Sequence, residues 1–401
     1  MTAAGGPDRA EGNAPTMTAT EAKRPERTAP FAGGAIAKRW LRLVRRRPVL
    51  ALVLAGLVLT VPGLTSLPPL DRDESRYAQA TAQMLESGNF IEIRFQDEAR
   101  NKKPVGIYWL QSLAVAALSE PSARQIWAYR VPSLIGALAA VLFAFWGGRR
   151  LFGDGVALLG ACWLAACLLV AAEATIAKTD AVLLACVTAM QMAMARIYLD
   201  ARASADPAAF QSPGGAALLF WVALGFGLLV KGPIAPLIAA ATATALAVAD
   251  RDVAWLRRLS PLPGLVIVAV IVLPWSAAIY QATDGAFFTE AFGVDLAPKL
   301  MGGAESHGAP PGVFTLAAPV LFWPATFLIL PAAVWSWRQR HDPSVRVCLA
   351  WLIPVWLVFE LTPTKLPHYV LPLLPPGMLL IAAFLRASTR MGRDGGPRLM
   401  L

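Results

Sequence analysis

The chain has 401 residues, of which 56% are hydrophobic and only 15% are charged. A soluble protein of this length would form two or three domains with charged surfaces, and this composition excludes that class. Runs of about 20 apolar residues, the length that a bilayer requires, recur along most of the chain. We therefore predict a polytopic membrane protein. We attribute the net charge of +10 to basic cytoplasmic loops rather than to nucleic-acid binding.

The two ends of the chain are expected to be cytoplasmic. Residues 1–34 are rich in Ala, Thr, Pro and Gly and contain no apolar core, so we interpret them as a disordered tail. The basic run 38–47 precedes the first apolar span and predicts that the N-terminus lies inside. Residues 35–390 form the predicted transmembrane domain, and residues 391–401 form a second tail.

The apolar runs predict an all-α fold with about ten transmembrane helices. Alternation from a cytoplasmic N-terminus puts short, mostly basic connectors inside and a large first loop, Leu70–Ala128, outside. The predicted spans lie near residues 48–66, 129–147, 154–172, 178–198, 215–231, 233–249, 262–281, 313–335, 345–362 and 367–385.

The first outer loop has the pattern of two amphipathic helices around a short extended piece. Asp71 or Asp73 is suited to cap the first helix, which ends near Gly88. An alternating run, Phe90–Phe95, is followed by a turn and by Pro104, which suits the first position of another helix. Acids gather at the start of this loop and lysines near its end, so we predict a site rather than a linker.

Two acidic positions are candidates for acid–base chemistry. Within Asp73–Glu74, a carboxylate beside the membrane could deprotonate a hydroxyl acceptor, whereas the structural alternative is a helix cap. We expect one cap and at least one functional acid among Asp71, Asp73 and Glu74. Asp180 opens a later span, where stabilisation by the helix dipole is an equally good explanation.

Lysines at the outer ends of spans predict an anion-binding site. Lys103, before Pro104, suits a phosphate, and Lys102 is the better candidate for a solvated loop charge. Lys231 lies between two apolar spans and needs a partner from elsewhere, for which a phosphate would serve. For Lys178, extension of the side chain to water explains its position equally well.

The motif order then points to a family. DRDESRYAQATAQMLESGNF, KKPVGIYWLQ, RVPSLIGALAA with RRLFG, AKTDA, LVKGP and TKLPHYVLPLLPP resemble, in this order, the C-type membrane glycosyltransferases. The chain is similar to the bacterial relatives of dolichyl-phosphate-mannose protein mannosyltransferases, over residues 48 to about 385. Within these it resembles the transferases that move 4-amino-4-deoxy-L-arabinose from undecaprenyl phosphate to lipid A.

This resemblance implies a polyprenyl-phosphate sugar donor, an inverting transfer and an active site on the periplasmic face of a bacterial inner membrane. The acceptor stays open between lipid A, another glycolipid and a protein. The sequence identifies no cofactor, and a divalent metal stays open. It implies Asp73 as the general base or as the residue that orients the acceptor, Asp180 as a second catalytic acid, Lys103 at the donor phosphate, and Glu305 and His307 toward the acceptor. Our further candidates are Glu74 in catalysis, Lys231 and Arg76 at the donor phosphate, and Tyr77, Tyr108, Lys365, His368 and Tyr369 at the substrates.

Two other function classes remain open at this point. A secondary transporter or lipid flippase would place charges near the bilayer midplane and repeat its halves, and neither pattern is apparent. A membrane assembly subunit without activity is the third interpretation. Related transferases continue past the TKLPHYVLP span with further helices, whereas this chain ends about sixteen residues after it, which leaves recognition of the acceptor in doubt.

Overall fold

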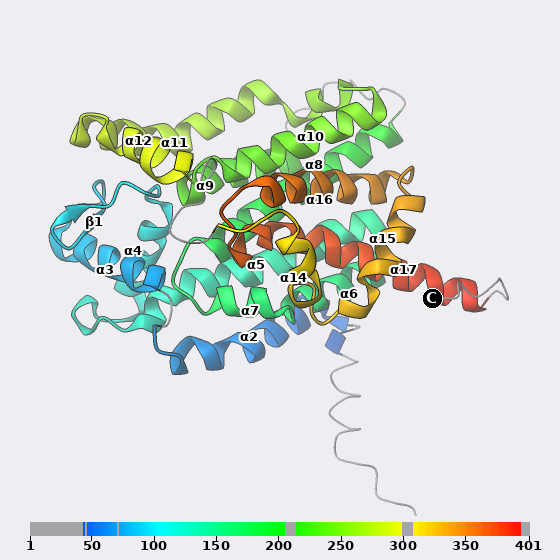
Figure 1. Cartoon of the computed structure of the whole chain (residues 1–401), viewed down its shortest axis with the longest axis horizontal. Coiled ribbons are helices and arrows are strands. Elements are labelled where there is room, and N and C mark those ends of the chain that lie inside the picture. Colours follow the sequence, from blue (N-terminus) through cyan, green and yellow to red (C-terminus); the bar gives the residue numbers. More distant parts are fainter. Residues whose placement is uncertain (1–42, 45, 70–71, 205–213, 299–307, 394–401) are drawn as a thin grey trace, which may run out of the picture. The chain divides into compact units, whose positions relative to one another are not determined.

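The computed structural model describes residues 43–393, except residues 45, 70–71, 205–213 and 299–307. The predicted tail 1–34 and most of the predicted tail 391–401 lie outside this range. The described part is almost entirely helical, with one small hairpin (Figure 1). The long helices are α2 (Pro48–Ser66), α5 (Ile126–Phe152), α8 (Asp180–Ala203), α9 (Gly215–Lys231), α10 (Ile234–Asp250), α11 (Pro261–Thr283), α16 (Pro343–Leu361) and α17 (Leu374–Arg393). The shorter ones are α3 (Arg72–Ser87), α4 (Gly106–Leu118), α6 (Asp154–Ala165), α7 (Leu168–Ala174), α12 (Ala286–Thr289), α14 (Val313–Leu321) and α15 (Ile329–Arg338).

Local sequence signals explain several helix ends. Helices α2, α11 and α16 each begin with proline, whose fixed φ suits the first turn. The Asp342 carboxylate accepts hydrogen bonds from the N–H groups of Ser344 and Val345, at 2.8 and 3.2 Å, and so caps α16. Gly232, at φ +63°, allows the sharp turn between α9 and α10.

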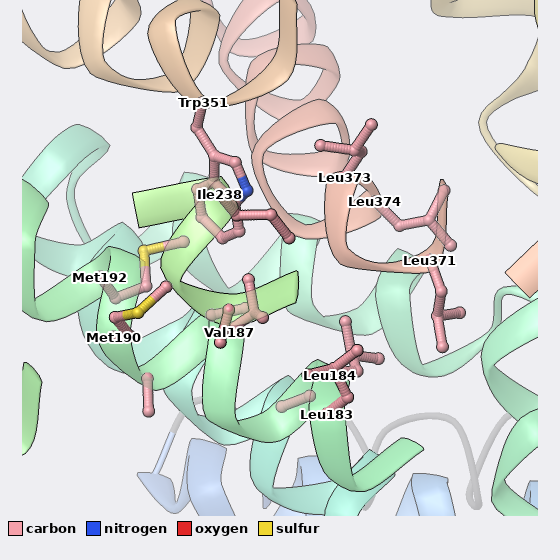
Figure 2. Packing of buried hydrophobic residues seen from close by; sticks show 14 of the residues in the cluster. Leu183, Leu184, Val187, Met190, Met192, Ile238, Trp351, Leu371, Leu373 and Leu374 are labelled. Atoms are coloured by element: carbon pink, nitrogen blue, oxygen red, sulfur yellow. The ribbon is translucent and has the colours of Figure 1, made fainter. Parts of the chain in front are cut away.

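Helix α8 lies at the centre of the packing, between α5 and α9 (Figure 1). Its apolar side chains meet residues of α10, α16 and the start of the last span in one cluster (Figure 2). The residues labelled there are Leu183, Leu184, Val187, Met190, Met192, Ile238, Trp351, Leu371, Leu373 and Leu374. Gly136 of α5 permits the close contact with α8, because a Cβ there would lie 2.7 Å from the carbonyl oxygen of Ala181.

Every one of the ten predicted spans contains helix, but the spans differ in continuity. Among the described residues, six helices are long and apolar enough to cross a membrane, or seven when α6 and α7, bent by 61°, count as one. The predicted span 313–335 is broken between α14 and α15. Helices α9 and α10 are apolar but shorter. The predicted helical fold is therefore confirmed, with six candidate membrane spans among the described residues. The number of ten crossings stays a prediction.

The first outer loop folds as α3, a hairpin of β1 (Arg94–Phe95) and β2 (Glu98–Ala99), and α4. The predicted extended run Phe90–Phe95 is mostly a turn, which the periodicity did not indicate. The reason is Asn89, whose side-chain oxygen accepts hydrogen bonds from the N–H groups of Ile91 and Glu92, at 3.0 and 3.1 Å. Such an asparagine turn competes with strand pairing.

Candidate active site

A cavity of about 620 Å³ lies among α3, the loop before α4, the start of α8, the turn between α9 and α10, and the start of the last span. One part of its lining is polar and charged. The polar residues are Asp73, Tyr77, Lys102, Lys103, Lys178, Thr179, Asp180, Lys231, Ser276, Thr362, His368 and Tyr369. Acids, bases and hydroxyl groups far apart in the sequence therefore meet in one chamber.

Asp180 and Lys231 form an ion pair at the centre of this polar part. Asp180 is almost fully buried, and His368 Nε2 lies 4.0 Å from its Oδ1 atom. Lys231 Nζ also lies 5.8 Å from the ring centroid of Tyr369. The partner that Lys231 needed is thus a carboxylate 51 residues earlier in the chain.

Helix ends explain why these charges are tolerated so close to apolar spans. Asp180 is the first residue of α8, and Lys231 is the last residue of α9. An acid at a helix N-terminus and a base at a helix C-terminus both interact favourably with the helix dipole. The packing of α8 against α9 brings the two ends together.

Lys178 does not need to extend to water, as the alternative interpretation required. Its Nζ atom lies 3.2 Å from the carboxylate of Glu173, and both side chains are buried. Glu173 comes from α7 and lies behind the cavity wall, whereas Lys178 lines the cavity. A buried charge is stable when it is paired in this way.

Asp73 lies at the more open side of the cavity. Its side chain is 49% exposed and its Oδ1 atom lies 3.5 Å from Arg76 Nη1, a geometry that gives a weak ion pair. Tyr77 follows one turn later on α3, and its ring lies 5.4 Å from that of Tyr108. Asp73 is therefore reachable from the cavity and from solvent.

The tyrosine pair is backed by a buried arginine that sequence reasoning missed. The guanidinium of Arg100 lies 5.3 Å from the Tyr77 ring centroid, and its Nε donates to the Tyr108 hydroxyl at 3.3 Å. Burial raises the pKa of Tyr77 well above its usual value, with a further contribution from Tyr108. The Tyr77 phenol is therefore neutral near pH 7 and can donate a hydrogen bond at the cavity wall.

Glu74 has a different position from Asp73, although the two are adjacent in sequence. Its carboxylate is buried and binds Arg130 through both oxygens, at 2.7 and 2.9 Å, and it also accepts the N–H of Ala177 at 2.8 Å. Arg130 donates in addition to backbone carbonyls at the end of α2, including Leu64 at 3.0 Å and Leu67 at 2.7 Å. This Glu74–Arg130 node joins the end of α2 and the starts of α3 and α5 to the turn before Asp180.

The cavity thus unites seven of the residues predicted from the sequence: Asp73, Tyr77, Lys103, Asp180, Lys231, His368 and Tyr369. Four others do not line it. Glu74 is bound in its node, Tyr108 lies behind Tyr77, and Arg76 contacts Asp73. Lys365 donates to the backbone carbonyls of Phe359, Glu360 and Thr362 at the end of α16, so its charge is used within the protein. Glu305 and His307 lie outside the described residues.

The remaining lining of the cavity is apolar and aromatic. It comes from α9, α10, α11, α12, the π-helical segment Glu290–Leu296 and α16. The residues include Leu228, Leu229, Ile234, Leu237, Val272, Trp275, Phe287, Phe288, Phe292, Val358 and Phe359. Trp275 fixes this wall to the first loop by donating to the carbonyl of Ile91 at 3.1 Å. One chamber can therefore hold a charged group and a long apolar chain together.

No group of three His, Cys, Asp or Glu side chains suited to hold a metal is found within the part of the chain that the structure describes. The four cysteines are free and lie in or beside apolar helices.

The chain is similar in sequence to known membrane glycosyltransferases. Residues 102–277 match the family model of dolichyl-phosphate-mannose-protein mannosyltransferase. The undecaprenyl phosphate-alpha-4-amino-4-deoxy-L-arabinose arabinosyl transferase of Enterobacter sp. (strain 638) is 28% identical over 77% of this chain and 54% of its own length. The chain therefore spans about half the length of the curated relatives it matches.

Several solved structures share the fold. The crystal structure of ArnT from Cupriavidus metallidurans bound to undecaprenyl phosphate is similar with a TM-score of 0.74 and 21% identity, over 86% of this chain and 61% of that one. The archaeal oligosaccharyltransferase AglB from Archaeoglobus fulgidus, in complex with an inhibitory peptide and a dolichol-phosphate, has a TM-score of 0.56 and 12% identity, over 91% of this chain and 53% of that one. These findings confirm the resemblance inferred from the sequence: the chain is similar to the membrane glycosyltransferases related to the dolichyl-phosphate-mannose-protein mannosyltransferases.

Proposed function

We propose that this chain is an integral membrane glycosyltransferase that moves a sugar from a polyprenyl phosphate, such as undecaprenyl phosphate, to an acceptor hydroxyl. The single observation that carries the proposal is the cavity in which acids and lysines meet a long apolar wall. An isoprenoid chain suits the apolar wall, and its phosphate suits the lysines. The curated relative named above carries undecaprenyl phosphate in its name, which supports this choice of donor.

In the proposed mechanism Asp73 acts as the general base. The acceptor hydroxyl oxygen attacks the anomeric carbon, its proton passes to the Asp73 carboxylate, and the bond from that carbon to the phosphate oxygen breaks. The electron pair leaves with the polyprenyl phosphate, which gains negative charge. Attack on the face opposite the leaving group inverts the anomeric centre. Positioning and charge stabilisation supply much of the rate in such sites.

The lysines have distinct roles in this proposal. Lys103 is half-buried at the cavity wall, and we assign it to the donor phosphate. Lys231 is held by Asp180 and also faces the cavity, so it stabilises the leaving phosphate as charge develops. Asp180 then orients Lys231 and His368 rather than taking up a proton.

Lys103→Met should weaken the use of the donor more than Lys103→Arg does, because the methionine removes the charge. A hydrogen bond to a charged group is worth about 1.5–3 kcal/mol, so we expect a rise in KM for the donor of roughly tenfold to a hundredfold. The measurement is sugar transfer at varied donor concentration. Arg94→Met is the control, since Arg94 is an exposed residue of the same loop outside the cavity. Equal, near wild-type values for both Lys103 variants would remove Lys103 from the donor site.

We place the active site on the periplasmic face and both termini in the cytoplasm. In a variant without the four natural cysteines, Asp97→Cys should react with an impermeant maleimide in intact spheroplasts, whereas His341→Cys should not. Both residues are exposed, so a difference between them reports the side of the membrane. The reverse labelling would invert the topology.

The proposed activity is tested with membranes that contain the full chain and a radiolabelled undecaprenyl-phosphate sugar. Transfer should convert the label to a new product and release unlabelled undecaprenyl phosphate. Extraction separates the acceptors, because labelled lipid A or another glycolipid dissolves in organic solvent and labelled protein precipitates. A donor that stays intact but crosses the membrane would indicate a flippase instead.

A further inference from the structure

A second cavity, of about 210 Å³, lies among the end of α5, the start of α6, α15, the first turn of α16 and the last turns of α17. It shares no lining residue with the first cavity. The residues around it are Leu151, Phe152, Val156, Trp335, Gln339, Asp342, Ser344, Val345, Ala383, Arg386, Ala387 and Arg390. The helix ends here carry the basic connectors that the sequence places at the cytoplasmic surface of the membrane.

The sequence of α17 creates both the space and the charge. Ala383 and Ala387 are one turn apart and small, so they leave room between α17 and α15. Arg386 and Arg390 are also one turn apart, line the same cavity and are exposed. Two guanidinium groups therefore lie beside a space that alanine leaves open.

The opposite wall is apolar. Phe152 and Val156 come from α5 and α6, and Trp335 comes from α15, where its ring packs against Phe384 with centroids 6.3 Å apart. Tryptophan is typical of the boundary between the apolar and polar layers of a membrane. A ligand in this cavity would thus meet positive charge on one side and hydrocarbon on the other.

The lining contains one acid, Asp342, and two arginines, so its net charge is +1. Asp342 is engaged as the cap of α16, where its Oδ1 atom accepts the two N–H groups of Ser344 and Val345. Of the neighbouring basic residues, Arg149 pairs with Asp154 and Arg150 with Asp200. The lining as a whole carries a surplus of positive charge.

We propose that this second cavity binds the headgroup of an anionic phospholipid. The phosphate lies between Arg386 and Arg390, and the glycerol and first acyl carbons lie against Phe152, Val156 and Trp335. Guanidinium groups bind phosphate oxygens with two parallel hydrogen bonds. Basic pockets between transmembrane helices bind anionic headgroups in this manner. The cavity has about a third of the volume of the first one, which suits a headgroup rather than a polyprenyl chain.

The test is native mass spectrometry of the delipidated full chain with added phosphatidylglycerol or phosphatidylcholine of the same acyl chains. Wild type should retain phosphatidylglycerol in preference, and Arg386→Gln/Arg390→Gln should weaken that binding at least about tenfold. The matched control is Arg338→Gln/Arg340→Gln, which removes two exposed arginines outside the cavity and should bind as wild type. Equal retention of the two lipids, or an equal loss in both double variants, would overturn the proposal.

Two further measurements test whether the cavity is needed for lipid binding and whether a free anion binds there instead. Ala387→Phe fills the space and keeps both charges, so it should also lose phosphatidylglycerol; full binding would mean that the arginines attract lipid without the cavity. Millimolar inorganic phosphate should leave the lipid bound, because it lacks the acyl chain. Displacement by phosphate alone would identify a free-anion site and contradict a lipid.

Discussion

Asp73→Asn should reduce sugar transfer by about 10²–10⁴-fold, the usual contribution of general acid–base catalysis. Asparagine keeps the shape of aspartate and can accept a hydrogen bond, but it cannot take up the proton of the acceptor hydroxyl. The fold should not change, because the Asp73 side chain is about half exposed and its ion pair with Arg76 is weak. The measurement is transfer from a polyprenyl-phosphate donor by the purified variant, with thermal unfolding as the check on folding.

Asp97→Asn is the matched control for this prediction. Asp97 belongs to the same outer loop, is exposed and does not line the cavity, so the same chemical change there should leave transfer near wild type. Asp73 is the second residue of α3. If its charge only stabilises this helix start, asparagine should cost at most about 1 kcal/mol of stability and leave transfer near wild type. Wild-type activity of Asp73→Asn would therefore disprove the assignment of the base.

Arg130→Met should have the largest effect on stability. It removes the guanidinium from a buried carboxylate and from carbonyls at the end of α2, and breaking a buried ion pair from one side costs about 3–5 kcal/mol. Because the Glu74–Arg130 node also holds the turn before Asp180 through Ala177, transfer should be lost as well. Thermal unfolding in detergent and the transfer assay measure the two effects.

The surface pair Arg124–Glu86 provides the comparison for Arg130. These side chains lie 2.5 Å apart and are each 49% exposed, so Arg124→Met should cost roughly 1 kcal/mol or less. The double variant Glu74→Leu/Arg130→Met leaves no unpaired charge. Its loss of unfolding free energy should therefore be smaller than the sum of the losses in the two single variants. An Arg130→Met protein as stable as Arg124→Met would show that the node is not needed for the fold.

Glu74 shows the limit of reading adjacent acids from sequence. Asp73 and Glu74 are neighbours in a motif, and both were candidates for catalysis. On a helix, however, consecutive side chains point about 100° apart, so one reaches the cavity and the other reaches Arg130. We therefore assign Glu74 to positioning. The sequence signal for the partner of Glu74 was Arg130, a lone arginine at the start of an apolar span.

The pattern of polar and apolar residues was enough to predict the helices and several candidate site residues from the sequence. Apolar runs predicted the helices, since a bilayer leaves backbone groups few other partners, and motif residues such as Asp73, Asp180 and Lys231 were identified before any contact was known. These features are local, so they can be read along the chain.

Only the tertiary structure decided which charges meet. Lys231 pairs with Asp180 across 51 positions and Arg130 with Glu74 across 56. Lys365 donates to backbone carbonyls at the end of α16. Sequence patterns show that a charge near the membrane needs a partner, because burial without one is costly. They do not show the partner, which depends on how α8, α9 and the first outer loop pack. The break in the span 313–335 is a local matter instead, because it contains Pro324, which lacks the N–H that a continuous helix needs.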